Sequence, residues 1–140
     1  MAFTGNFFCT SAKVGFFTGT YTPLTDTMKI ALYTNLATLD ATTTVYSAAN
    51  EVVGTGYTAG GNILTGTAIS FSGTTVWLTF SDTFWTTATI VARGALIYDS
   101  TRANAAIAVL DFSSDKTSTA NTFTIQMPTA AAGTALIRIV

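Results

Sequence analysis

Apolar and polar residues alternate along much of the chain, which is the pattern of β-strands that bury one face. Met28–Tyr33 and Thr122–Met127 carry large apolar side chains at every second position. Ala95–Tyr98 and Ala106–Phe112 are almost continuously apolar, which predicts strands at the buried centre of a sheet. The same reasoning predicts further strands at Asn62–Leu64, Ala68–Phe71, Val76–Phe80, Phe84–Arg93 and Leu136–Val140.

Polar segments separate these strands at short intervals, as in sandwich and jelly-roll proteins. Asp99–Asn104 and Ser113–Asn121 are rich in turn residues, and Thr34–Ala49 is a long polar connection. Helical segments between the strands are missing, which disfavours a parallel sheet with crossover helices. We therefore predict an all-β fold, an antiparallel and jelly-roll-like β-sandwich, in which residues 1–140 form a single domain.

One short helix is predicted near the N-terminus. Thr10 or Ser11 is suited to cap its start, and Val14 and Phe17 are spaced to share one helix face. Gly19 is suited to end it, because glycine readily adopts the left-handed conformation that follows many helices.

The N-terminal arm, about residues 1–20, is also rich in phenylalanine. A terminal segment usually frays unless it is held by packing, so these rings must be covered by something. Two arrangements are open: the arm packs under the sandwich, or it reaches onto another subunit. The second arrangement makes five residues candidates for an assembly interface: Phe3, Phe7, Phe8, Phe16 and Phe17.

Charge is scarce in this sequence. Only 9% of the residues are charged and the net charge is -1, whereas a typical soluble domain has about 25% charged residues. Threonine supplies about a fifth of the 140 positions, so a threonine-rich surface replaces the charged one. Copies of the chain therefore repel one another very little, which allows a homo-oligomer, although a threonine-rich β-protein explains the composition equally well.

Several classes of function are disfavoured by the residues that are rare or missing. Six scattered Lys and Arg residues cannot neutralise a run of phosphates, so nucleic acid is not an expected partner. Cys9 is the only cysteine and there is no histidine, so we expect no disulfide within the chain, no metal site and no cofactor. The apolar runs are too short for a membrane helix and no signal peptide is visible, which predicts synthesis in a cytoplasm and no membrane partner.

A glycine-rich stretch, Gly54–Ala59, fits the G-x-G-x-x-G/A fingerprint of dinucleotide-binding proteins. That fingerprint needs a helix directly after it, but Gly60 and Gly61 follow and then a strand-like segment. The next acidic residue, Asp82, is too far along the chain to bind a ribose. We therefore predict a backbone bend in which glycines supply positive φ angles or close packing, with the Tyr57 ring buried and its hydroxyl bonded to a partner.

Three acidic residues, Asp99, Asp111 and Asp115, lie near predicted strand ends. Two carboxylates could serve a glycosidase, and several could bind calcium. The favoured interpretation is structural: Asp99 and Asp115 are turn residues, and Asp111 pairs with an arginine. Arg93 lies in an apolar region and needs a carboxylate beside it, so Arg93, Asp99 and Asp111 are candidates for a structural ion pair. The functional alternative for Arg93 is recognition of a neighbouring subunit.

Three aromatic residues, Trp77, Trp85 and Tyr98, have two possible roles. Exposed aromatic faces stack on sugars, so these residues could form a carbohydrate platform. Their usual role is in the core, although Trp77 falls on the face opposite Val76 and Leu78.

Several longer strings resemble small virion structural proteins of tailed bacteriophages. The resemblance extends from about Lys29 to the C-terminus, and the N-terminal FTGNFFCTSAK is similar as well. The strings are NEVVGTGYTAGG, WTTATIVARGALIYD, VLDFSSDKTSTANTFTIQMP and ALIRIV. No catalytic motif comes with the resemblance.

The resemblance implies a structural protein of the virion, synthesised in the host cytoplasm, and not an enzyme. We expect a capsid decoration or cement protein that stabilises the shell by non-covalent contacts with the major capsid protein and with other copies of itself. The alternative is a tail or tail-fibre module, next to other tail proteins, that binds host surface glycans.

Overall fold

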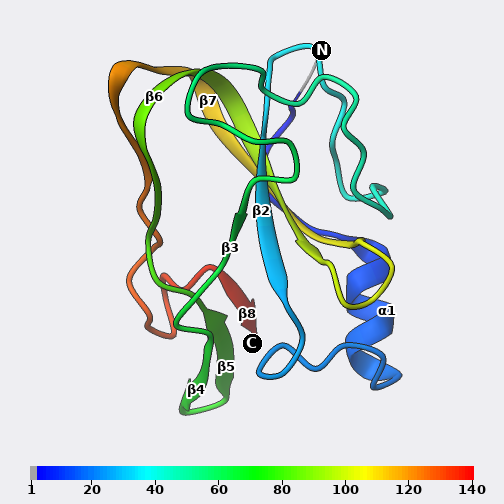
Figure 1. Ribbon diagram of the computed structural model, residues 1–140. Coiled ribbons are helices and arrows are strands. Elements are labelled where there is room, and N and C mark those ends of the chain that lie inside the picture. Colours follow the sequence, from blue (N-terminus) through cyan, green and yellow to red (C-terminus); the bar gives the residue numbers. More distant parts are fainter. Residues whose placement is uncertain (1–2) are drawn as a thin grey trace.

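A computed structural model describes residues 3–140, which form two antiparallel β-sheets and one short helix (Figure 1). The larger sheet has the strand order β1-β7-β6-β2-β3, and the smaller sheet has the order β4-β5-β8. The predicted all-β character and the single N-terminal helix are therefore confirmed. The elements are β1 (Phe7–Phe8), α1 (Thr10–Phe17), β2 (Met28–Tyr33), β3 (Asn62–Ile63), β4 (Ala68–Ser72), β5 (Thr75–Thr79), β6 (Thr83–Asp99), β7 (Ala105–Ile125) and β8 (Ile137–Ile139).

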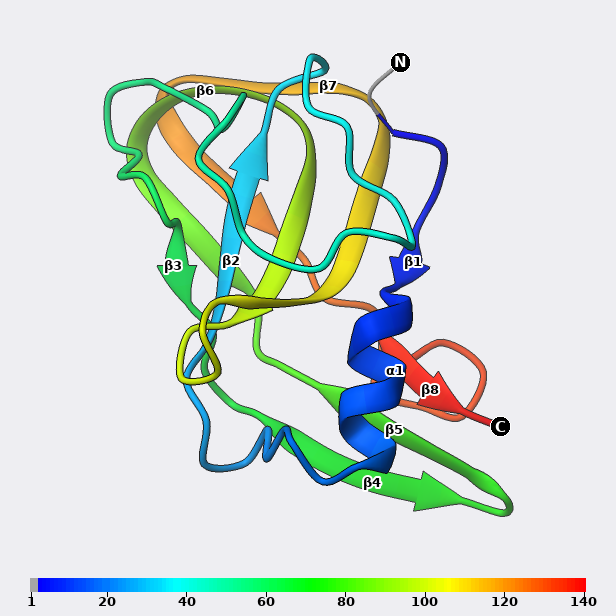
Figure 2. The same ribbon diagram turned by 90° about the vertical axis from the view of Figure 1, so that its right-hand side faces the viewer.

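Strands β6 and β7 form one long hairpin, in which each strand replaces two of the predicted ones. The register shifts at four places along the hairpin, so the ladder bends rather than breaking (Figure 2). The prediction of a turn at Ser113–Asn121 is wrong, because this segment continues β7 and pairs with β6, for instance Thr117 with Val91. Its polar composition reflects exposed side chains, while backbone hydrogen bonds to β6 keep it extended.

The centre of the larger sheet is buried on both faces. Successive residues such as Leu96 and Ile97 in β6 have no exposed surface, and neither does Val109 in β7. Two covers pack there: the N-terminal arm and the connection between β2 and β3, residues 34–61. Phe3 of the arm packs against the backbone of β6 at Gly94, and Tyr46 of the connection stacks on Tyr98. The continuous apolar runs in the sequence reflect this double burial.

Helix α1 begins at Thr10 after Cys9, and no side chain caps its first turn, so the expected hydroxyl cap is not observed. Thr18 ends the helix: its N–H and its hydroxyl both donate to the carbonyl of Val14. Gly19 follows with a φ of +72°, in the left-handed region expected of it.

The helix packs through its smallest residues. Ala12 and Gly15 are buried, and a Cβ at Gly15 would collide with the ring of Tyr21. Val14 and Phe17 share a face as predicted, but that face points to solvent, with 58% and 85% exposure. From Phe3 onward, the N-terminal arm therefore packs on the larger sheet and also presents an apolar outer surface.

Candidate assembly surface

The three-stranded sheet has one face made only of apolar side chains. Residues directly opposite each other in adjacent strands lie on the same face, as do residues two apart in one strand. Ile69 lies opposite Leu78 and Phe71 opposite Val76, while β8 places Ile139 beside Val76. We call the resulting set the apolar face: Ile69, Phe71, Val76, Leu78, Ile137 and Ile139.

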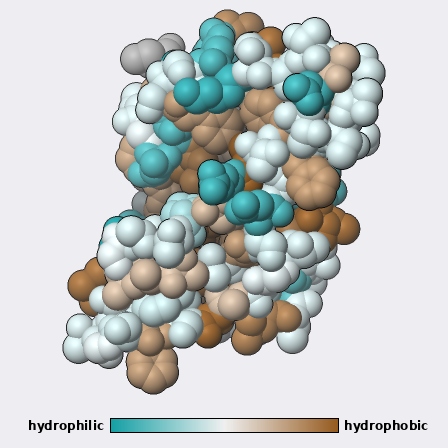
Figure 3. All heavy atoms as spheres, turned by 90° about the vertical axis from the view of Figure 1, so that its left-hand side faces the viewer, coloured by the Kyte–Doolittle hydropathy of each residue, from teal (hydrophilic) through white to brown (hydrophobic). Residues whose placement is uncertain are grey.

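Only part of the apolar face is covered by the rest of the chain. Leu78 and Ile137 are buried where Phe8 and Phe16 approach, and the side chains between them line an apolar cleft of about 100 Å³. At the other end of the sheet, Phe71 is 73% exposed. Hydrophobic side chains also reach the surface in Figure 3 at the lower end of the molecule, at the height of β4 and β5 in Figure 1.

The exposed apolar surface continues from the sheet onto the helix. Phe17 and Ile139 line a second hollow of about 380 Å³, together with Lys13 and Arg138. The Lys13 ammonium lies 6.0 Å from the centre of the Phe8 ring. Exposed clusters of this kind usually mark surfaces that another molecule covers.

The five phenylalanines proposed for an assembly interface do not form one exposed surface. Phe3 is 2% exposed and its ring packs against the backbone at Gly94, so it belongs to the core and is not available to a partner. Phe7, Phe8 and Phe16 are half-buried against that core. Phe17 alone projects into solvent. Sequence reasoning could not separate them, because a cluster of rings does not reveal which ones the sheet covers.

Sequence analysis missed the main part of the surface, which lies in β4. Its signal was present in the sequence: Ile69 and Phe71 alternate with small polar residues, and no charged residue or proline occurs between Glu51 and Asp82. All five residues of β4 are exposed.

The expected group of Arg93, Asp99 and Asp111 is only partly formed. Arg93 Nε lies 3.1 Å from Asp111 Oδ1, and Asp111 also accepts the backbone N–H of Ser113. Asp99 does not join them, because Asp111 pairs with Gly94 and Asp99 lies five residues further along β6, about 17 Å away. That part of the prediction was wrong, since Asp99 lies beside the hairpin turn and Asp111 lies further along β7.

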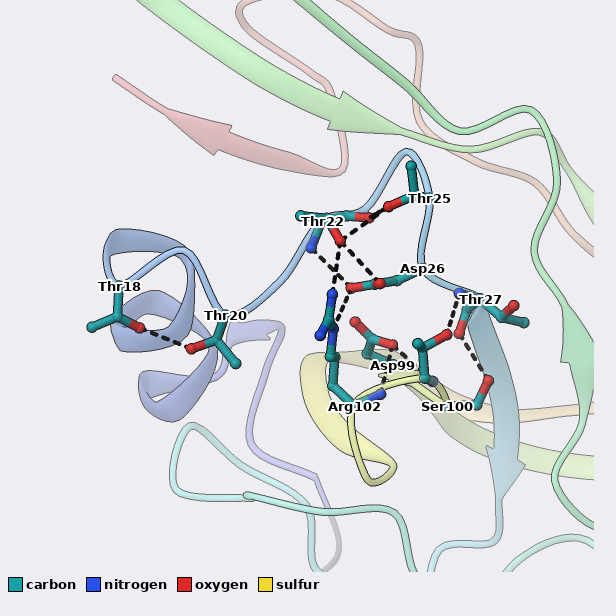
Figure 4. Close-up of polar contacts among 10 residues, drawn as sticks. Thr18, Thr20, Thr22, Thr25, Asp26, Thr27, Asp99, Ser100 and Arg102 are labelled. Carbon is teal, nitrogen blue, oxygen red and sulfur yellow. Dashed lines mark hydrogen bonds and ion pairs between the residues drawn. The ribbon is translucent and has the colours of Figure 1, made fainter.

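Asp99 instead faces Asp26, in the loop that leads from α1 to β2 (Figure 4). Asp26 accepts hydrogen bonds from the N–H and hydroxyl of Thr22, both at 2.9 Å, and from Arg102 Nε at 3.1 Å. The Oδ1 of Asp99 accepts the backbone N–H groups of Thr101 and Arg102 at 3.0 and 3.2 Å. Asp99 is thus the turn residue that the sequence predicted, and its buried Oδ2 atom has no hydrogen-bond partner.

The two carboxyl groups have opposite pKa shifts. Burial, and then contact with Asp26, raises the pKa of Asp99 to about 6. Burial alone would raise the pKa of Asp26 too, but hydrogen bonds from Arg102 and Thr22 hold it well below its usual range. The Asp99 side chain has no exposed surface and that of Asp26 is 3% exposed, so a substrate cannot reach this pair. The loop is held to the β6–β7 turn by the ion pair of Arg102 with Asp26 and by the hydrogen bond from the Thr27 N–H to the Thr101 hydroxyl.

The other acidic residue of the predicted cluster also has a structural position. Asp115 lies within β7 rather than in a turn, and accepts a hydrogen bond from the side-chain amide of Asn35 at 3.3 Å. No group of three or more Cys, Asp or Glu side chains suited to a metal occurs among residues 3–140.

The glycine-rich stretch forms the predicted bend and not a phosphate-binding turn. Gly61 has a φ of +70° and its Cα approaches the carbonyl of Ile30 so closely that a Cβ would collide with it. Gly54 has no room for a Cβ either, because the carbonyl of Thr89 lies against it. These close approaches let residues 34–61 lie directly on the strands of the larger sheet.

Tyr57 anchors this bend, and its partner is the buried carboxylate of Glu51. The Tyr57 hydroxyl donates to Glu51 Oε1 at 2.5 Å and accepts the backbone N–H of Leu32. Glu51 also accepts the Tyr46 hydroxyl at 2.7 Å and the Gly60 N–H at 2.7 Å. Burial, followed by the bond to Glu51, raises the pKa of Tyr57 far above its ordinary value, so the phenol stays a donor.

The aromatic residues suggested as a sugar platform are buried. Trp77, Trp85 and Tyr98 are 9%, 5% and 2% exposed. Tyr98 stacks on Tyr46 with ring centres 4.6 Å apart, and Trp85 packs edge-on against Phe123. Their faces are therefore occupied within the chain, and the platform interpretation was wrong.

Cys9 is a buried free thiol whose pKa is raised to about 11, first by burial and then by Asp40. No helix within residues 3–140 has the length and apolar character needed to cross a bilayer.

Comparisons with known proteins identify no relative of this chain. No protein-family model, no curated protein and no solved structure matches this chain.

Proposed function

We propose that this chain is a structural protein of a tailed-phage virion, of the capsid decoration or cement type. It acts by binding and not by catalysis: copies join one another and the major capsid protein, and the added contacts stabilise the shell. The proposal also includes the predicted fold, in which the two sheets form a jelly-roll-like sandwich.

The observation that carries this proposal is the half-covered apolar face of the β4-β5-β8 sheet. Phe71, Val76 and Ile139 expose 73%, 43% and 52% of their surface, and Phe17 on α1 exposes 85%. With a net charge of -1, little repulsion opposes burying these side chains against another subunit. A contact of ordinary size buries about 1,600 Å², and repetition over a shell multiplies its effect.

The strings that resemble small virion proteins support the virion context over other assemblies. Two of them, WTTATIVARGALIYD and VLDFSSDKTSTANTFTIQMP, correspond mainly to β6 and β7, the long hairpin of the larger sheet. A tail module that binds glycans is less favoured, because the aromatic rings suggested for sugar stacking lie in the core.

The test is quantitative mass spectrometry of purified particles. The proposal predicts the chain on intact capsids in a fixed ratio to the major capsid protein, and an absence from detached tails. Recovery in tails alone would contradict the capsid position, and absence from both fractions would contradict a virion role.

A second measurement compares the heat resistance of particles with and without the chain. Capsids that lack it should release their genome at a lower temperature, and adding back the purified protein should restore the original value. Adding back a Phe17→Ser variant should restore less, whereas Val53→Ser, a control on the 34–61 connection where Val53 is 97% exposed, should act as the wild type.

A further inference from the structure

Strand β4 is an edge strand with none of the features that usually prevent edges from pairing. Natural proteins protect sheet edges with lysine, proline, bulges, very short strands or a covering segment. The edges of the larger sheet, β1 and β3, are only two residues long. β4 has five residues, all exposed, with no charge and no proline, and Figure 2 shows it along the lower margin of the molecule.

The β4–β5 hairpin determines which backbone groups of β4 are free. Its turn has two residues, Gly73 and Thr74, so Ser72 and Thr75 form the pair that exchanges hydrogen bonds next to the turn. Because hydrogen-bonded residues alternate along a strand, Ser72, Ser70 and Ala68 direct their N–H and C=O groups toward β5. Ile69 and Phe71 direct theirs outward.

These outward groups are complementary to a second copy of the same strand. When two β4 strands run antiparallel about a two-fold axis at Ser70, Ile69 of one copy lies opposite Phe71 of the other. Each such pair exchanges two backbone hydrogen bonds, so both free residues of both copies are fully satisfied. Any shift by one residue would leave the outward groups facing residues whose own groups point to β5.

The same register also matches the side chains. Ile69 and Phe71 lie on the apolar face, so the two-fold pairing sets apolar against apolar across the new junction. The two apolar faces then form one continuous surface over six strands. Strands β4 and β5 bring no charge to the junction, since the chain carries none between Glu51 and Asp82.

We propose that two copies of this chain join through β4 in an antiparallel pairing centred on Ser70, giving one six-stranded sheet. This inference rests on the proposed function, because it names the surface through which copies associate. It makes the dimer the unit that presents the joined apolar face to the shell.

Introduced thiols test the register. At the two-fold axis, Ser70 and its counterpart form a non-hydrogen-bonded pair with Cα atoms about 4.5 Å apart, which suits a disulfide. Ser70→Cys should therefore give a disulfide-linked dimer under mild oxidation, since the native Cys9 is buried. Ser72→Cys is the matched control: its Cα lies four residues from its counterpart, about 13 Å, so it should stay monomeric on a non-reducing gel.

Sedimentation equilibrium of the unlinked protein tests association itself. The wild type should be a dimer, and Phe71→Lys should raise the dissociation constant at least tenfold, because it sets a charge at the junction. Val53→Lys should leave it unchanged. Circular dichroism of each variant checks that the fold is retained. If Phe71→Lys unfolds, Ile69→Pro takes its place, because proline removes the outward N–H at position 69 without breaking a hydrogen bond to β5.

The outcomes separate this inference from the proposed function. Equal cross-linking of Ser70→Cys and Ser72→Cys, or a monomeric wild type at high concentration, overturns the β4 pairing even if the chain is found on capsids. A monomer whose β4 amides become protected only when shells are added would instead assign the edge to the capsid protein, which also overturns it. A β4-linked dimer that is absent from particles leaves the pairing intact and removes the virion role.

Discussion

The two sheets of this protein are both antiparallel, but their surfaces and edges are covered differently. The larger sheet ends in the two-residue strands β1 and β3, and residues 34–61 and the N-terminal arm cover it. The smaller sheet ends in the five-residue strand β4, and half of its apolar face is in solvent. Alternation of apolar residues therefore reveals a strand's buried face, but not whether its own chain or another one covers that face.

The largest effect is expected where the larger sheet is most tightly covered. Gly61→Ala would place a Cβ against the carbonyl oxygen of Ile30 at a φ of +70°, so the connection must move away from β2. We expect a loss of more than about 3 kcal/mol in the free energy of unfolding, measured by urea denaturation. Gly133→Ala, where the added Cβ meets no neighbour, should change stability by less than about 0.5 kcal/mol.

The buried carboxylate of Glu51 should give the next largest effect. Glu51→Gln keeps the size of the side chain but replaces one acceptor oxygen with an NH₂ group, while three donors still point at it. We expect a loss of about 2–3 kcal/mol by urea denaturation, with no change in self-association. A variant as stable as the wild type would mean that this network does not hold the cover in place.

Asp99 should make stability depend on pH. The pKa of Asp99 is about 6 in the folded protein and about 3.9 in an unfolded chain, so its proton favours the folded state at low pH. This contribution is fully present below about pH 4 and is lost as the pH rises through 6. Asp99→Asn removes the buried charge, so it should be more stable than the wild type by about 2 kcal/mol at pH 8 and similar at pH 4.

The pH dependence of the free energy of unfolding also tests whether Asp99 is in contact with Asp26. Wild type and Asp99→Asn should have different slopes between pH 4 and 7. Parallel curves over that range would contradict the account of the Asp26–Asp99 contact. Asp26 acts in the opposite direction, since its lowered pKa adds stability above pH 4 that is lost on further acidification.

Substitutions at two valines, one in each sheet, should have the smallest effect on the free energy of unfolding. They compare directly how well the two sheets are covered. Val109 in β7 has no exposed surface, while Val76 in β5 is 43% exposed. Replacing valine by threonine keeps the shape and adds a hydroxyl. Val109→Thr should cost about 1.5 kcal/mol because its hydroxyl is buried, and Val76→Thr should cost less than about 0.5 kcal/mol in the monomer. Equal losses in urea denaturation would show that the two faces are equally covered.

Local pattern predicted most of the strands and their turns. Met28–Tyr33 is β2 to the residue, and the turn after Asp99 is where its polar residues suggested. Pattern failed at Ser113–Asn121, because that part of β7 is extended by pairing with β6 and not by burial of its own side chains. The residue composition of this segment does not indicate that it pairs with another strand.

The site was harder to predict because it depends on contacts between distant segments. The sequence offered Asp99 and Asp111 as partners for Arg93, and the structure pairs Arg93 with Asp111 on the neighbouring strand of the hairpin. It could not pair Asp99 with Asp26, which lies 73 residues earlier in the sequence, nor show that Phe3 is covered while Phe17 is not. Ile69 and Phe71 were identified as strand residues, yet only the sheet order shows that β4 is an edge.

The central claim is that the smaller sheet is completed by a second copy, and amide hydrogen exchange in β4 tests it most directly. The N–H groups of Ile69 and Phe71 should exchange quickly in dilute protein and at least tenfold more slowly at a concentration where the chain is dimeric. Those of Ser70 and of Val109 should be protected under both conditions. Exchange at Ile69 and Phe71 that stays fast at every concentration would contradict the claim.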